Sequence, residues 1–475
     1  MRILVVADKI NFMNKVMISL LILGIIFSSC TTSVSMEMAT ATVSPQPLVT
    51  AITNQSTAIA VPAADTENEI IFWHPWSGVK ANVLAELVEE YNQSNQEGVK
   101  VEVAALGDEN FLISKVEESI ADHLIPDVLA APSYYLRSLY KDGGLLKDLD
   151  EFVNDSKIGI SSDEQKTIPA SFWNLDLSDG IRYAVPAEYD LHFLLYNQTW
   201  AKELGFKNAP ANSDEFLNQA CAAARFNAND ENEENNGTGG WIYNTDAVTM
   251  LSWMQVFGGG ELPLETDSIV HFDTKADQQA LEFLRTIYQL DCAWTGKEAR
   301  PQRYFAQRYA LFYSGDITDW YRQITMDKLI GNTDEWTVIG YPGNNGNPIV
   351  NAETISYGIL KSTPAREKVA WDFIHWLLSD EVQKRFVEET FSLPINLNIA
   401  PKLNDFIKDN PSWQHLLTFL PFATPISSLS NWNLISALFQ DIGWQLSLYT
   451  VKEADIPSIL KNFEDMLSEK LNDER

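Results

Sequence analysis

The sequence has few cysteines and histidines and lacks the motifs that mark several classes of enzyme. Only 3 cysteines and 6 histidines occur in 475 residues, and they form no His-Glu-x-x-His motif or cluster at metal-ligand spacing. A Gly-x-Ser-x-Gly turn and a Walker-type phosphate loop are also missing. The glycine-rich stretches at 237–240 and 258–260 lack the dinucleotide spacing and indicate turns. We therefore predict a protein that is not an enzyme and needs no cofactor.

Positive charge is also scarce. The chain has 34 Lys and Arg against 65 Asp and Glu, a net charge of -31. Neutralising phosphates and binding anionic lipid both require basic side chains, so this balance argues against nucleic acid or an anionic membrane surface as partner. The acidic excess fits a well-solvated protein surface.

The apolar run near the N-terminus is short. Residues 16–27 form a run of about twelve residues, whereas a membrane-spanning helix needs roughly 20. With Lys15 before it, the run is typical of a secretory signal peptide. Because Asp8 is unusual in such a segment, we expect synthesis to start at Met13. The signal peptide is assigned to residues 1–29.

A cysteine follows the apolar run directly. Ser28, Ser29 and Cys30 resemble a bacterial lipobox, in which the cysteine is lipid-modified and becomes the new N-terminus; Phe27 departs from the usual Leu. An ordinary thiol beside a short membrane anchor is the alternative. The following stretch, up to residue 67, is rich in Ser, Thr, Ala and Pro without helical or strand period, so 30–67 is predicted to be a lipid-anchored flexible linker.

About 400 residues remain, more than one hydrophobic core usually organises, so at least two lobes are expected. Their first part alternates strands and helices, with predicted elements at 70–73, 79–91, 99–103, 111–120 and 126–130. This order predicts an α/β fold with a mostly parallel sheet and crossover helices. Ligands usually bind at the carboxyl ends of such strands, here near 74–77 and 131–134. At the C-terminus an apolar stripe predicts a core-covering helix: Ile459, Leu460, Phe463, Met466 and Leu467.

The order of several segments resembles family 1 of the bacterial extracellular solute-binding proteins, the maltose-type and glycerol-phosphate-type receptors of ABC importers. These segments are IIFWHPWSG, LVEEYNQSNQEGVKVEV, IPDVLAAPSYYLRSLYKDGGLLKDLDEFV, GIRYAVPAEYDLHFLLYNQTWAKELGF, ALFYSGDITDW and VAWDFIHWLLSDEVQKRFVEETFSLPIN. One departure lies at Thr390-Phe391, where the family commonly has Thr-Gly.

The resemblance implies a two-lobed periplasmic-binding-protein-like fold of type II, with the ligand cleft between the lobes. The chain would cross between the lobes near 187–190, 351–354 and 398–403. Lobe one would then comprise 68–187 plus 354–398, and lobe two 188–353 plus 399–475. Such a division gives short hinges between rigid units.

Candidate ligand-binding residues follow from sugar chemistry and from the loops that the resemblance places at the cleft. Sugars present C–H faces ringed by hydroxyl groups, which aromatic rings and carboxylates or amides can bind. The candidates from lobe one and the crossings are Trp76, Ser77, Ser133, Tyr134, Glu188, Asp190 and Glu353. Those from lobe two are Trp253, Gly315, Asp316, Trp320 and Trp432. For Trp253 the alternative is a core position, for Glu188 and Asp190 a solvated hinge acid, and for His74 we expect a packing role.

Two further cysteines could form a disulfide, and an acidic loop could bind a metal. Cys221 and Cys292 are predicted to pair, since an exported protein permits a disulfide. The acidic segment 229–236 does not match the EF-hand spacing, because position six from Asp230 is Asn235. We predict a solvated loop and no required metal.

Together these features predict a lipid-anchored, monomeric receptor at the extracytoplasmic face of the cytoplasmic membrane. It would bind a carbohydrate and deliver it to the membrane subunits of an ABC permease. A glycerol-phosphate receptor is one alternative, although the predicted cleft loops carry no Arg or Lys and Arg182 is the nearest basic candidate. An extracellular glycoside hydrolase with paired acids is the other.

Overall fold

The computed structural model describes residues 68–122, 124–262, 271–297, 300–426 and 432–473. They belong to one compact unit of the chain. The predicted signal peptide, Cys30 and the linker up to residue 67 lie outside the described residues. Among the described residues, no helix combines the length and the apolar character that crossing a membrane requires.

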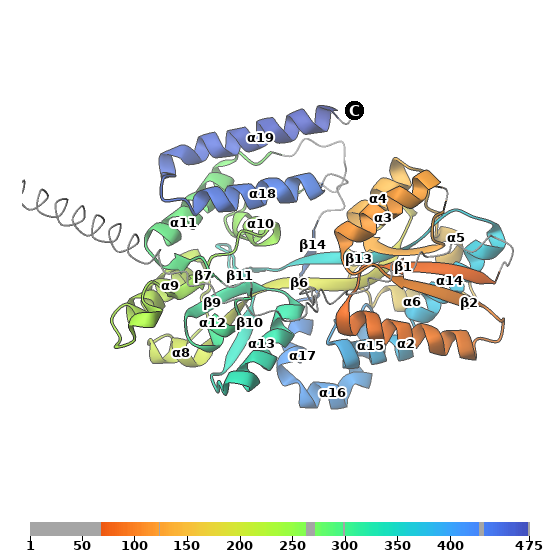
Figure 1. The fold of residues 1–475 in the computed structure, drawn as a ribbon, viewed down its shortest axis with the longest axis horizontal. Helices are drawn as coiled ribbons and strands as arrows, with labels where there is room; N and C mark the ends of the chain where they lie inside the picture. The colour runs from red at the N-terminus through yellow and green to blue at the C-terminus, as the bar shows by residue number, and fades with distance from the viewer. Residues whose placement is uncertain (1–67, 123, 263–270, 298–299, 427–431, 474–475) are drawn as a thin grey trace, which may run out of the picture. The chain divides into compact units, whose positions relative to one another are not determined.

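One ten-stranded sheet runs through the fold (Figure 1), with its main strands in the order β2-β1-β3-β13-β6-β9-β7-β8. These strands are β1 Glu69–His74, β2 Lys100–Ala105, β3 Val128–Pro132, β6 Val185–Asn197, β7 Gly239–Ile242, β8 Ala293–Trp294, β9 Ala310–Gly315 and β13 Asn351–Ile359. Two further strands join at the side, β10 Trp336–Ile339 on β6 and β14 Thr424–Pro425 on β13. Two-stranded pairs are formed by β4 Leu177–Ser178 with β5 Ile181–Arg182, and by β11 Tyr341–Pro342 with β12 Pro348–Ile349.

The first part of the sheet confirms the predicted strand and helix alternation. β1 pairs in parallel with β2 and with β3, and the helices α2 Gly78–Ser94 and α3 Glu109–Asp122 connect them. α2 buries the apolar face predicted from its period, which consists of Val83, Leu84, Leu87, Val88 and Tyr91. Because β1 is covered on both faces, its residues from Ile70 to His74 are all buried.

Further helices surround the first part of the sheet. They are α4 Ser133–Lys141, α5 Asp150–Val153, α6 Ser162–Gln165, α7 Ala170–Trp173, α14 Pro364–Leu377 and α15 Asp380–Thr390. α14 lies against β1 and β13, and α15 lies against α2.

The second part of the sheet is built from β9, β7 and β8, which also pair in parallel. Its helices are α8 Gln198–Glu203, α9 Ser213–Asn227, α10 Ala247–Val256, α11 Lys275–Gln289, α12 Gln302–Ala306 and α13 Ile317–Ile330. The C-terminal elements are α16 Asn404–Asp409, α17 Pro411–Leu417, α18 Trp432–Leu446 and α19 Ile456–Asp473, with 3-10 turns η1 Glu233–Asn235, η2 Leu397–Leu403 and η3 Glu453–Asp455. α18 packs on α10, and α19 packs on α11. Four residues of the predicted stripe on α19 are buried, whereas Met466 is 47% exposed.

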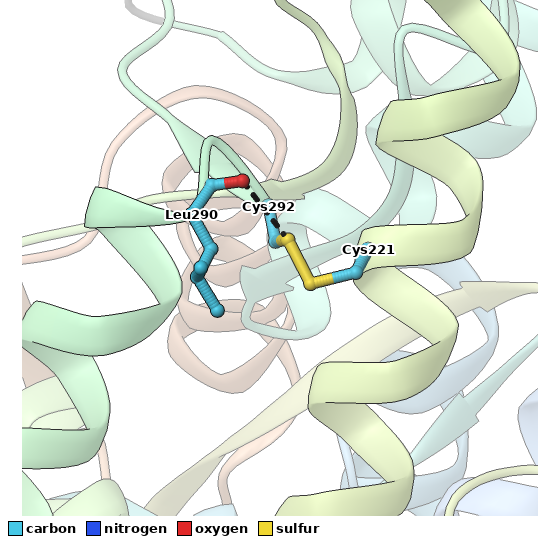
Figure 2. The surroundings of a disulfide bond; sticks show 3 residues. All are labelled: Cys221, Leu290 and Cys292. Atoms are coloured by element: carbon cyan, nitrogen blue, oxygen red, sulfur yellow. Dashed lines mark hydrogen bonds between the residues drawn. A yellow bond between two sulfur atoms is a disulfide. The ribbon is translucent and has the colours of Figure 1, made fainter.

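A disulfide ties α9 to the start of β8 in this second part. Cys221 and Cys292 are bonded, with their Cα atoms 4.5 Å apart (Figure 2). The close approach requires glycine at position 240, because a Cβ there would lie 1.9 Å from the carbonyl oxygen of Cys292.

The long strands β6 and β13 connect the two parts. Residues 185–192 of β6 pair with β13, and residues 193–197 pair with β9 and β10. The register of β6 and β13 shifts between Ile355 and Ser356, opposite Glu188 and Pro186. Glu188 therefore lies at an irregularity of the two long strands.

Candidate binding cleft

A cavity of about 560 Å³ lies where the two parts of the fold meet, and we call it the interlobe cavity. Its walls come from the turn between β1 and α2, the start of α3, the crossing strands, the first turns of α13 and the end of α15. The volume is in the range of sites that bind small organic molecules. The cavity lies at the carboxyl end of β1, which is where parallel α/β folds place their ligands.

A partly buried ion pair lines the cavity. Glu188 on β6 accepts hydrogen bonds from the indole N–H of Trp76 and from the ammonium group of Lys80. Burial alone would lower the pKa of Lys80, but the charges of Glu188 and Asp190 hold it above its ordinary value. The pair therefore connects the first turn of α2 to the crossing strand.

Asp190 and Asp316 occupy the N-terminus of α13. Asp190 accepts the backbone N–H of Ile317 at 3.1 Å, and Asp316 caps the helix by accepting the N–H of Asp319 at 2.8 Å. Burial, followed by the charge of Asp316, raises the pKa of Asp190 well above its usual range. Two N–H groups in the first turn of α13 are therefore bound by the protein's own carboxylates.

A second ion pair faces a neighbouring cavity of about 260 Å³ that Gly315 and Asp316 also line. The Nε2 atom of His192 lies 2.9 Å from Oε2 of Glu353. Burial would lower the pKa of His192, but the hydrogen bond and the charge of Glu353 raise it to about 10.

Raising the pH from about 6.5 to about 10 is expected to remove the contribution of this pair to stability. The pKa of His192 rises from 6.5 to about 10 on folding, so the stabilisation is complete below the lower value and is lost as the pH passes the higher one. Urea unfolding of the unaltered chain and of His192→Gln, measured from about pH 6.5 to about pH 10, tests this prediction. The difference in unfolding free energy between them should shrink as pH rises; a constant difference would contradict the assignment.

A separate small cavity of about 20 Å³, which we call the neck, shares the lining residue Glu109 with the interlobe cavity. Ser133, Tyr134, Glu353 and Trp432 form its other polar and aromatic walls. The hydroxyl of Tyr134 donates to Oδ1 of Asn433 on α18 at 2.8 Å, which joins the two sides of the cleft. Burial, and then the charges of Glu353, Glu188 and Asp108, raise the pKa of Glu109 to about 8.

The structure brings most of the candidate residues to this cleft. Trp76, Ser77, Glu188 and Asp190 line the interlobe cavity; Ser133, Tyr134, Glu353 and Trp432 line the neck; and Gly315 and Asp316 line the smaller cavity. Trp253 and Trp320 do not reach these three cavities. Both are fully buried in hydrophobic clusters, so Trp253 takes the alternative core position and Trp320 belongs to the buried face of α13.

Sequence reasoning did not identify most of the other residues that line the cavity, among them the charged and aromatic residues Lys80, Asp108, Glu109, Tyr321, Arg322, Glu389 and Phe391. The predicted cleft loops carry no Arg or Lys, but the helices beside them contribute two basic residues, Lys80 and Arg322, to the cavity. Lys80 lies in the first turn of α2, and Arg322 lies in the second turn of α13. Arg182 is instead buried, with its guanidinium 3.6 Å from the centre of the Trp173 ring and donating to the carbonyl of that residue at 2.8 Å. His74 is buried against Trp76, as a packing residue would be.

Residues spaced for metal binding occur away from the cleft. Within the described residues, His271, Asp273 and Glu464 form the one such group, and it lies at the surface. Exposed acidic clusters are common without an ion, and the 229–236 carboxylates form no such group in the described part of the chain.

The fold and the cleft define a two-lobed solute-binding protein, and comparison with known families agrees. The profile of the family described as bacterial extracellular solute-binding protein matches residues 86–414, which is more than half of the chain. The chain belongs to this family. No curated protein matches the sequence.

Solved structures with the same fold include receptors for different solutes. The sugar-binding protein MalE from Xanthomonas citri has a TM-score of 0.71 at 20% identity, covering 85% of this chain and 98% of that one. The cyclic alpha-maltosyl-1,6-maltose binding protein from Arthrobacter globiformis has a TM-score of 0.68 at 19% identity, covering 85% and 99%. UgpB from Mycobacterium tuberculosis, solved with glycerophosphocholine, has a TM-score of 0.68 at 17% identity, covering 86% and 99%.

Proposed function

We propose that this chain is the substrate-binding component of an ABC importer, and that it binds a carbohydrate between its lobes and delivers it to the membrane permease. The observation that carries the proposal is the interlobe cavity, whose walls come from both parts of the sheet and combine aromatic rings with carboxylates. Such a combination suits the C–H faces and hydroxyl groups of sugars. Proteins with the same fold that bind sugars support the same class.

The proposal includes the domain division and the ligand set. The hinges lie near 187–190, 351–354 and 398–403, and they separate lobe one (68–187 plus 354–398) from lobe two (188–353 plus 399–475). Ligand binding favours the closed arrangement, which the permease then recognises. The candidates at the interlobe cavity, Trp76, Ser77, Glu188 and Asp190, bind or position the ligand, together with those at the neck and the smaller cavity.

We also propose that the protein acts as a monomer held by a lipid on Cys30 at the extracytoplasmic face of the membrane. Residues 30–67 form the tether, and the assignment to an extracellular solute-binding family supports this location. The protein has no catalytic role in this proposal. A glycoside hydrolase would instead release p-nitrophenol from a p-nitrophenyl glycoside, and the release would stop on substitution of a cleft carboxylate.

A glycerol-phosphate ligand is the second candidate, because Arg322 and Lys80 line the interlobe cavity and UgpB was solved with glycerophosphocholine. The negative charge of the cavity makes a glycerol-phosphate ligand a weaker candidate than a carbohydrate. Lys80 is already paired with Glu188, and burial raises the pKa of Glu109 and of Asp190, so the carboxylates of Asp108, Glu188 and Glu389 face two basic groups in this cavity. A phosphate would therefore enter a site with an excess of negative charge.

The thermal midpoint of the full-length chain is expected to rise by several degrees with a matching sugar, because a ligand at 100 times its Kd stabilises the native state by about 2.7 kcal/mol. The measurement is a melting series with maltose, maltotriose, tagatose, glycerol and glycerophosphocholine. A dose-dependent shift with a sugar supports the proposal. A shift with glycerophosphocholine alone would select the second candidate, and a shift with neither would contradict both.

A further inference from the structure

The aromatic residues at the interlobe cavity differ in how much of the ring is free. Trp76 is only 6% exposed, and its ring packs against His74, Tyr357 and Phe386, while its N–H is bound to Glu188. At the neck Trp432 is buried to a similar degree. These tryptophans therefore present little ring surface to a ligand.

Two other aromatic residues of the cavity do present ring surface. Tyr321 on α13 is 43% exposed and Phe391 is half-buried, and both line the interlobe cavity. Their ring centres are 4.9 Å apart, with the planes inclined at 34°. The two rings pack against each other and form one aromatic cluster in the cavity wall, which we call the Tyr321–Phe391 platform.

The backbone of Phe391 shows that the protein keeps a large side chain where glycine is favoured. Phe391 ends α15 with φ at 61°, the left-handed conformation, and its N–H donates to the carbonyl of Val387 at 2.8 Å. Helices commonly end with glycine at such a position, because a Cβ is unfavourable there. The ring of Phe391 also packs against two other aromatic rings, those of Trp320 at 5.9 Å and Phe406 at 5.3 Å, measured between ring centres.

The platform joins elements from the two parts of the fold. α15 packs on α2, beside β1, whereas α13 follows directly from β9. Phe391 also packs on Trp320 and Phe406 of the second part, and its carbonyl accepts the indole N–H of Trp413 at 3.0 Å. The platform therefore lies at the junction of the two parts.

We propose that Tyr321 and Phe391, and not the tryptophans, form the stacking surface for a pyranose ring, with Phe391 setting the preference for ligands that have an apolar ring face. This inference rests on the proposed function. The C–H face of the sugar lies on the two rings, and its hydroxyl groups point to carboxylates in the same cavity, among them Asp108 and Glu109. An open-chain ligand has no such face and gains little from the platform.

The test compares Phe391→Asn, Phe391→Tyr and Tyr321→Ala with the unaltered full-length chain by titration calorimetry. Asparagine tolerates the left-handed conformation, so Phe391→Asn removes the ring without enforcing a new backbone. Phe422→Ala is the matched control, because Phe422 is 46% exposed and lies outside the lining of the cavity. The probe is whichever of maltose, maltotriose and tagatose binds the unaltered chain most tightly, with glycerophosphocholine as the open-chain comparison.

Phe391→Asn and Tyr321→Ala are each expected to weaken sugar binding about tenfold, while Phe391→Tyr and Phe422→Ala stay within about twofold of the unaltered chain. Melting of each ligand-free variant separates lost binding from lost folding. Equal sugar affinity in Phe391→Asn and the unaltered chain would overturn the platform and leave the proposed function intact. Absence of sugar binding by the unaltered chain would overturn the proposed function, and the platform with it.

Discussion

Replacing Glu188 with alanine is expected to lower the free energy of unfolding by about 3 kcal/mol, the lower end of the range for breaking a buried ion pair. The substitution removes the ionic partner of Lys80 and the acceptor of the Trp76 indole N–H. The side chain of Lys80 keeps 22% exposure, so water can replace part of the lost interaction. Urea unfolding measures the change, and calorimetry should show lost sugar binding as well, because Glu188 lines the interlobe cavity.

Two variants serve as controls for the Glu188 prediction. Glu188→Gln keeps an oxygen for the Trp76 N–H but not the charge, so an intermediate loss is expected. Asp465→Ala breaks a pair with Lys461 in which both side chains are largely exposed, and the unfolding midpoint should stay unchanged. If Glu188→Ala and Asp465→Ala unfold at the same urea concentration, the buried pair does not contribute to stability.

The fold could be predicted from the sequence because its signals are periodic. The alternation of Val99, Val101 and Val103 identified the strand at β2, and the spacing from Val83 to Tyr91 identified the buried face of α2. These patterns arise because a helix or strand buries one face, and the residues on that face recur at a fixed spacing along the chain. The order of the family segments then supplied the two-lobed arrangement that local patterns cannot give.

The composition of the cleft could be predicted only in part, because it depends on which side of a helix turns inward. Trp320 and Tyr321 are adjacent, yet a rotation of about 100° per residue puts the first in the core and the second at the cavity. Lys80 and Phe391 reach the cavity from a helix start and a helix end, and their exposure follows from packing between distant segments. The spacing of residues in the sequence does not predict packing between distant segments. Sequence reasoning therefore favoured tryptophans as ligand platforms, whereas burial leaves Trp76 and Trp432 little free ring surface.

Replacing Cys221 and Cys292 together with alanine is expected to lower the free energy of unfolding by about 4 kcal/mol, since the bridge closes a loop with a sequence separation of 71 residues. The bridge constrains the unfolded chain and joins α9 to β8 within one hydrophobic cluster. A decrease of several degrees in the thermal midpoint follows from this loss. Neither cysteine lines the interlobe cavity or the neck, so sugar affinity at 25 °C should be unchanged.

Reduction of the unaltered chain provides the independent check on this bridge. Dithiothreitol should lower the thermal midpoint of the unaltered chain toward that of the double variant, and it should leave the double variant itself unaffected. Because the bridge lies in the second part of the sheet, its loss should weaken that part first, while the sheet around β1 keeps its own core. An unaltered chain whose midpoint is insensitive to reduction would show that the bridge contributes nothing to stability, and that close packing around Gly240 holds α9 and β8 together without it.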